Sequence, residues 1–140
     1  MSINLQELIA KLNKDLEYEY AALIQYVQHA TVIKGAKYGL IQKELVVHAQ
    51  EELQHAMMLA EQIDYLGGTP TVDVEERAVS TDTREMLEQD LRGEQSAIDG
   101  YKERIAEAES LGEYGLRRVL EDILIQEEEH KRDLLAVFEV

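Results

Sequence analysis

Apolar residues recur at helical spacing along nearly the whole chain, and this pattern predicts four long helices and no strand. In the first segment, residues three and four apart form one apolar stripe, which a helix would turn toward the core. That stripe comprises Leu5, Leu8, Leu12, Leu16, Leu23, Val27 and Ala30. The stretches that lack this periodicity contain glycines and the single proline, which end helices. The predicted helices span residues 4–34, 38–66, 82–110 and 114–140, with Thr81 or Asp82 as the cap of the third.

The lengths of the connections predict how these helices are arranged. Two connections are short and contain Gly35 and Gly112, so each should join antiparallel neighbours. The middle connection, of about 15 residues, would reach roughly 50 Å if extended. The second helix, of about 29 residues, is roughly 43 Å long, so the connection can return along the whole bundle. We therefore expect one all-α domain over residues 1–140, folded as an antiparallel four-helix bundle with one long crossover.

Six candidate metal ligands occupy core positions of this predicted bundle. Two helices each carry a Glu-x-x-His pair, whose members share one face because they are three residues apart. The other two helices each carry a lone Glu in the heptad register of core Leu and Tyr residues. The set comprises Glu19, Glu52, His55, Glu94, Glu127 and His130.

A pair of divalent cations reconciles these residues with a stable core. Unpaired carboxylates would each cost several kcal/mol when buried, and the pattern puts no Lys or Arg on the seam at their level. Glu-rich ligation with imidazole suits iron or manganese better than zinc or copper. Symmetry between the two halves of the chain makes Glu52 and Glu127 the expected bridging ligands. The remaining ligand sets are Glu19 with His55 for one ion and Glu94 with His130 for the other.

Several nearby residues allow two interpretations. Tyr26 is two turns beyond the first-helix Glu and is either a redox or hydrogen-bonding neighbour of the metals or a core Tyr with a paired hydroxyl. For Tyr101, we favour the core interpretation. His48 is either an accessory metal ligand or, as we favour, a structural core or interface histidine, and His29 is expected to be structural. Glu51 falls off the seam and should be solvated.

Composition excludes several classes of function. The chain has no Cys, which excludes disulfides, thiolate zinc sites, iron–sulfur centres and thiol nucleophiles and favours a reducing cytoplasm. The net charge of −15 argues against a nucleic-acid partner. No apolar run is long enough to span a membrane, and the N-terminus lacks a signal-peptide pattern.

The spacing and context of the candidate ligands resemble bacterioferritin over essentially the whole chain. The residues that carry this resemblance are Glu19 with Gln25-Tyr26 and His29, Glu52-x-x-His55-Ala56, Glu94, and Glu127-Glu128-x-His130. The resemblance implies a ferritin-like fold and a ferroxidase that oxidises Fe(II) to Fe(III) with O₂ or H₂O₂. It also implies a centre of two iron ions held by the six ligands, with Tyr26 close by, and identical subunits forming a hollow shell for ferric mineral.

The sequence departs from bacterioferritin in two places. Bacterioferritins bind haem through a Met directly after the second-helix Glu, and Leu53 stands there, so haem is not expected. The sequence ends at Val140 without a counterpart of the family's short fifth helix. We therefore expect a homo-oligomer that is either a dimer or a shell.

Two other functions stay open. One is a di-iron peroxidase resembling rubrerythrin, which would need a separate electron donor because the chain has no Cys to hold an iron–sulfur-type centre. The other is a metal-free helical interaction module. Mini-ferritins that coat DNA fit less well, because they build each metal site from two subunits and this chain supplies a full set alone.

Overall fold

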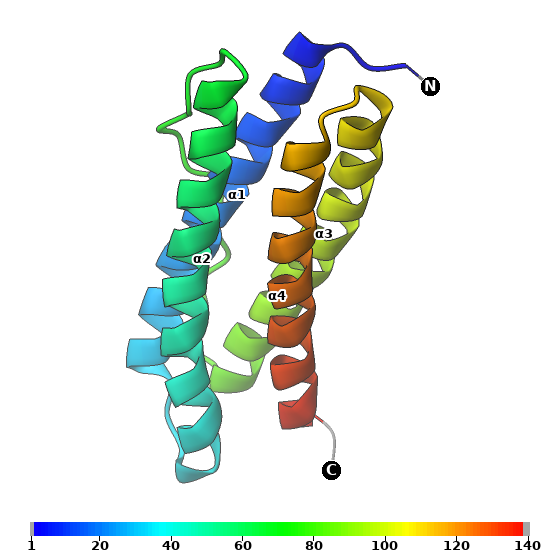
Figure 1. Cartoon of the computed structure of the whole chain (residues 1–140). Coiled ribbons are helices and arrows are strands. Elements are labelled where there is room, and N and C mark those ends of the chain that lie inside the picture. Colours follow the sequence, from blue (N-terminus) through cyan, green and yellow to red (C-terminus); the bar gives the residue numbers. More distant parts are fainter. Residues whose placement is uncertain (1, 139–140) are drawn as a thin grey trace.

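The computed structural model describes residues 2–138, and these residues form an antiparallel four-helix bundle without a strand. The helices pack as two hairpins, and the connection between the hairpins returns along the bundle, as Figure 1 shows. The elements are α1 (Leu5–Val32), the short 3₁₀ helix η1 (Ala36–Tyr38), α2 (Gly39–Tyr65), α3 (Thr83–Ser110) and α4 (Tyr114–Phe138). The predicted fold class is thereby confirmed, and the other helix ends lie within about two residues of those expected; the expected end of the fourth helix, at residue 140, lies outside the described residues.

Side chains next to the first residues of α1 and α3 cap these helices. The Asn4 side chain accepts a hydrogen bond from the Glu7 amide (2.8 Å), and Glu7 accepts one from the Asn4 amide (3.4 Å), which makes a capping box. Asp82 caps α3 by accepting from the Glu85 amide (2.9 Å). Glu85 does not return a hydrogen bond to the Asp82 amide, so α3 has no capping box. Its carboxylate accepts from the Ser80 hydroxyl (3.0 Å), which in turn accepts from the Asp82 amide.

Two adjacent glycines end α2. Gly67 has φ of 94°, the left-handed conformation that favours glycine, and the Gly68 amide donates to the Ile63 carbonyl (2.9 Å). A Cβ on Gly68 would lie 2.5 Å from the Ile9 side chain of α1. The second glycine therefore lets the end of α2 lie against α1.

The crossover is bound along the side of α1. Asn13 accepts from the Thr71 amide (2.8 Å), and the Tyr20 hydroxyl donates to the Thr71 carbonyl (3.1 Å). Five residues after Tyr20 on α1, the Gln25 side-chain amide donates to the Ala78 carbonyl (2.8 Å). The long connection thus has partners for its backbone although it has no regular secondary structure.

The apolar core is divided into two clusters, one toward each end of the bundle. Full burial of each Leu or Ile contributes about 1.5–3 kcal/mol. The first cluster includes Leu8, Leu12, Leu16, Leu59, Ile63, Leu116, Leu120 and Ile123. The second includes Tyr26, Ile41, Leu45, Met86, Leu87 and Leu134. The layer between them holds the polar residues described below.

The prediction that the apolar stripe of α1 is buried is wrong for two of its residues. Leu5 is 39% exposed and Val27 is 53% exposed. Leu5 lies in the first turn, at the end of the bundle, where no neighbouring helix covers it. Val27 follows the buried Tyr26 and is therefore rotated about 100° away from the core face.

Within residues 2–138, every helix falls short of the combination of length and apolarity that crossing a lipid bilayer requires.

Candidate metal centre

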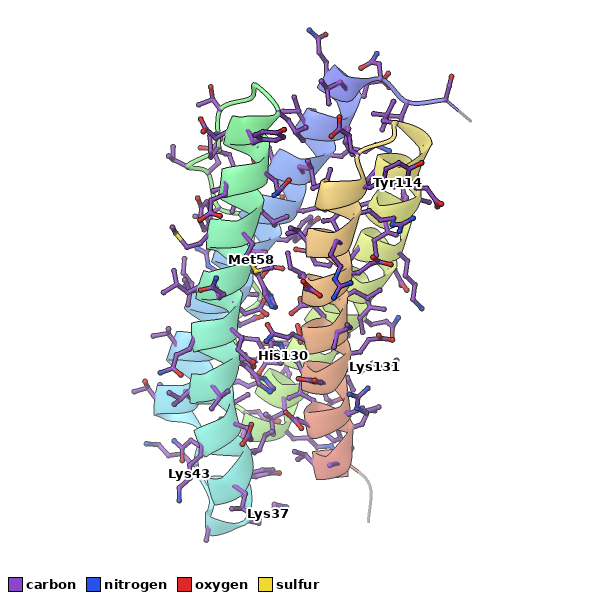
Figure 2. The ribbon with its side chains drawn as sticks, viewed as in Figure 1. Lys37, Lys43, Met58, Tyr114, His130 and Lys131 are labelled. Atoms are coloured by element: carbon purple, nitrogen blue, oxygen red, sulfur yellow. The ribbon has the colours of Figure 1, made fainter. Side chains whose placement is uncertain are left out.

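The six candidate ligands converge in the polar layer between the two apolar clusters. α1 contributes one carboxylate, α3 another, and α2 and α4 a Glu-x-x-His pair each. In Figure 2, His130 projects from α4 into the space between α4 and α2. None of the six is more than 2% exposed; they are Glu19, Glu52, His55, Glu94, Glu127 and His130.

These residues form two overlapping clusters of possible ligands. Within each cluster, one ligand atom from every residue lies within 4.8 Å of the others. Glu52 and Glu127 belong to both clusters. We call Glu19 with His55 the first half-site and Glu94 with His130 the second half-site. The shared pair is the pair that sequence symmetry predicted to bridge two ions.

Both imidazoles present Nδ1 to the shared carboxylates. His55 Nδ1 lies 3.3 Å from an oxygen of Glu52 and 3.3 Å from one of Glu127. His130 Nδ1 lies at the same two distances from the same carboxylates. Each imidazole also faces the Glu of its own half-site, Glu19 at 3.6 Å and Glu94 at 2.8 Å. All four carboxylates and both imidazoles thus surround one common space.

The outer nitrogen of each imidazole has a partner on the opposite helix pair. His55 Nε2 donates to the Gln126 amide oxygen at 2.5 Å. His130 Nε2 lies 2.9 Å from Glu51, which corrects the expectation that Glu51 is simply solvated. Such partners fix the tautomer and leave Nδ1 free to bind a metal. Sequence reasoning missed both residues, although each directly precedes a bridging Glu and so has a recognisable position.

The two tyrosines near the centre differ in their hydrogen bonding. The Tyr101 hydroxyl donates to Glu19 at 2.5 Å, so Tyr101 is a core tyrosine with a paired hydroxyl, as we favoured, and its partner is a candidate ligand. The Tyr26 hydroxyl has no hydrogen-bond partner among residues 2–138, and its ring lies edge-on to the ring of His130, with centroids 6.2 Å apart. Burial raises the pKa of both phenols well above the usual range, so both remain protonated at neutral pH.

The close approach of these groups shifts their pKa values. Burial raises the pKa of Glu52 well above its usual range, and the Glu127 carboxylate raises it further; the same two causes act on Glu94. Burial lowers the pKa of His55 and His130, but the carboxylates, Glu127 foremost, outweigh burial and raise it. Burial raises the pKa of Glu127, but contacts with the two imidazoles outweigh it and lower that pKa. Protons therefore occupy part of this site when no cation does.

The residues present fit a pair of cations. Thirteen buried side-chain nitrogen and oxygen atoms in the described chain lack a hydrogen-bond partner, and eight of them belong to the six candidate ligands. No Lys or Arg of residues 2–138 forms an ion pair with these six. The buried guanidinium of Arg104 pairs instead with Asp15 and Glu107. Buried acceptors that all face one space and lack donors are the arrangement that metal ions satisfy.

A cavity of about 440 Å³ leads to this site between α1 and α3. The four candidate carboxylates form part of its wall. Residues 76–78 of the crossover line it as well, so the segment bound to α1 borders the approach to the centre. The cavity therefore extends from the side of α1 and α3 to the four candidate carboxylates.

The other two histidines are also buried. His29 Nδ1 lies 2.8 Å from Asp90, which is a buried structural pair as expected. His48 Nε2 lies 3.1 Å from Asp133, and its ring stacks on the ring of His130 with centroids 4.0 Å apart.

Together, the four-helix topology with one long crossover and the buried carboxylate–imidazole clusters are typical of the ferritin-like class of proteins. A sequence match to the Ferritin-like domain covers residues 9–140. The chain therefore belongs to the ferritin-like domain family.

Its relatives include two kinds of protein. A bacterioferritin of Brucella melitensis is 31% identical over 137 residues, which are 93% of this chain and 85% of that protein. A nutrient stress-induced DNA-binding protein of a Nostoc species is 31% identical over 84% of this chain and 70% of that protein.

Two solved structures share the fold. One, described as a ferritin-like, diiron-carboxylate protein of Bacillus anthracis, superposes with a TM-score of 0.93 at 34% identity, covering 99% of this chain and all of that one. The other is a bacterioferritin-related, dodecameric thioferritin of Bacteroides fragilis, with a TM-score of 0.90 at 30% identity over 98% of this chain and 87% of that one. Oligomers thus occur among the proteins similar to this chain.

Proposed function

We propose that this protein is a ferroxidase that oxidises Fe(II) to Fe(III) at a centre of two iron ions within one subunit, in iron storage or detoxification. The observation that most strongly supports this proposal is the pair of overlapping, buried ligand clusters that share Glu52 and Glu127. The similarity to a bacterioferritin and to a diiron-carboxylate protein supports iron as the metal. Manganese would suit the same donor set.

The reaction takes Fe(II) as its substrate. Two Fe(II) ions give up one electron each, and one O₂ takes up both electrons with two protons to become H₂O₂. With H₂O₂ as the oxidant, the same two electrons and two protons yield two waters. The balance needs no other reductant, which agrees with a chain that has no Cys to hold a second redox centre.

The residues of the chain balance the charge of the ions, hold the ligands in position and keep the centre buried from solvent. Four carboxylates offset the charge of two divalent ions, and the imidazoles add neutral nitrogen ligands once their protons leave. Gln126 and Glu51 hold the two rings with Nδ1 facing inward. Tyr101 orients Glu19 by donating to one of its oxygens, which leaves the other for the ion.

We further propose a homo-oligomer without haem. α1 and α2 expose apolar side chains, among them Ile24, Val46 and Leu53, which a second copy of the chain would cover. The dodecameric relative supports assembly of this kind. At the position that corresponds to the haem ligand, Leu53 is 51% exposed and has no atom able to bind iron.

The decisive experiment combines iron counting with rapid oxidation. Anaerobic protein should bind two Fe(II) per centre and oxidise them within seconds of mixing with O₂ or H₂O₂. Glu94→Ala should abolish the rapid phase and leave the helix content unchanged. Glu129→Ala removes an exposed carboxylate on α4 and is the matched control. Equal kinetics in all three proteins would refute the proposal.

The same experiment separates the alternatives. Sustained H₂O₂ consumption with an added reductant and without ferric product would indicate a peroxidase of the rubrerythrin kind. Protein purified without chelator that contains no metal and binds none would indicate a helical interaction module.

A further inference from the structure

A third group of ligand-type side chains lies on the face where α2 meets α4. It consists of Glu44 and His48, one turn apart on α2, and Asp133 on α4. One ligand atom from each lies within 4.8 Å of the others. This group shares no residue with the two clusters of the metal centre.

The imidazole of this group is built into the core. His48 is 0% exposed, while Asp133 is partly exposed and Glu44 is exposed. Its Nε2 points toward the carboxylates and lies 3.1 Å from Asp133. Its Nδ1 is buried and has no hydrogen-bond partner in the described chain. Because its partner Asp133 is an acceptor, Nε2 carries the ring proton when no cation is bound. A cation at Nε2 would replace that proton, and the ring would then carry its proton on Nδ1.

We propose that Glu44, His48 and Asp133 form a third site for a divalent transition-metal cation. One imidazole nitrogen with two carboxylates favours Fe(II), Mn(II) or Zn(II) over Mg²⁺ and Ca²⁺, which prefer oxygen ligands alone. The exposed side of the group leaves room for water to complete the coordination. Such an open site binds and releases its ion more readily than the buried centre does.

The site adjoins the second half-site. The His48 ring stacks on the His130 ring with centroids 4.0 Å apart and planes 23° apart. Glu51, one turn after His48 on α2, contacts His130 Nε2, and its side chain is 28% exposed. A cation at the third site therefore has a carboxylate between itself and the centre. This arrangement gives the site a role in loading Fe(II) into the second half-site. The loading role rests on the proposed function, whereas cation binding at the third site does not.

Iron counting in a chain that lacks the main centre tests cation binding directly. Glu52→Ala removes a ligand shared by both clusters, and anaerobic equilibrium dialysis against Fe(II) should then leave about one bound ion per chain. Adding Glu44→Gln and Asp133→Asn should abolish that ion. Adding Glu61→Gln and Glu129→Gln removes two exposed carboxylates from the same two helices and should retain it. Equal iron in the two sets would overturn the site.

Kinetics test the loading role. In the otherwise native chain, Glu44→Gln with Asp133→Asn should slow Fe(II) oxidation several-fold at low iron and leave the two-ion capacity of the centre unchanged. If the third ion is lost and the oxidation rate does not change, the loading role is refuted but the cation site is not. A third ion retained by a protein without ferroxidase activity would refute the proposed function alone.

Discussion

The two half-sites have the same ligands and different surroundings. In the first, His55 is held by a neutral amide, Gln126, and Glu19 accepts a hydrogen bond from Tyr101. In the second, His130 is held by a carboxylate, Glu51, and Tyr26 makes no hydrogen bond among residues 2–138.

This difference predicts that the two half-sites bind their ions with unequal affinity. A carboxylate behind an imidazole raises the basicity of the ring and adds negative charge close to the metal, whereas an amide only orients the ring. The second half-site also adjoins His48, and the first does not. We infer that the second half-site binds its ion more tightly and that the first is the site from which an ion leaves more readily.

The largest effect should come from removing what the half-sites share. Glu52→Ala should lose both ions and lower the rate of Fe(II) oxidation by more than about 100-fold, beyond the 10–100-fold cost of losing an outer partner. Glu19→Ala and Glu94→Ala should each lose one ion. Anaerobic Fe(II) titration counts the ions, and circular dichroism checks the fold. Loss of a single ion in Glu52→Ala would contradict bridging.

Exchanging the residues that contact the Nε2 atoms of the two imidazoles should reverse the order of metal affinity of the half-sites. Glu51→Gln should weaken metal binding at the second half-site about 10-fold or more, and Gln126→Glu should strengthen it at the first. Calorimetric titration of the two single variants and the double variant measures both changes. Equal affinities in all of these proteins would show that the outer charge has no influence.

Acidification should weaken binding at both half-sites. The pKa values of His55, His130, Glu52 and Glu94 are raised, so these groups hold protons that a cation must displace. Affinity should therefore fall as pH is lowered, by about tenfold per pH unit for each proton released. Titrations in buffers of different ionisation enthalpy count those protons, and no buffer dependence would contradict the pKa shifts.

The smallest effects should come from the tyrosines. Tyr101→Phe removes a hydrogen bond to Glu19 and should weaken the first half-site by less than tenfold, or about 1 kcal/mol. Tyr26→Phe removes a hydroxyl without a partner and should leave the number and affinity of bound ions unchanged. Fe(II) titration of both variants measures the number of bound ions and their affinity. A larger loss in Tyr26→Phe than in Tyr101→Phe would reverse our assignment.

Sequence periodicity was sufficient to predict the fold and the convergence of the six candidate ligands. Glu19 and Glu94 could be chosen among many Glu residues because they share the heptad register of buried Leu and Tyr residues. The surroundings of the site could not be predicted in this way. Whether Gln126 or Glu51 reaches an imidazole across the bundle depends on the relative rotation and axial offset of two helices, which heptad register does not fix. The partner of the Tyr101 hydroxyl could not be named for the same reason, since Glu19 lies on another helix.

The separation of the apolar core into two clusters has a consequence for how ions are exchanged. Leucine and isoleucine packing joins the helices on both sides of the polar layer, independently of anything bound there. In small zinc domains, by contrast, the metal is itself a condition of folding. Here the scaffold can stay assembled while its cargo is taken up and released, which is what repeated turnover of iron would demand.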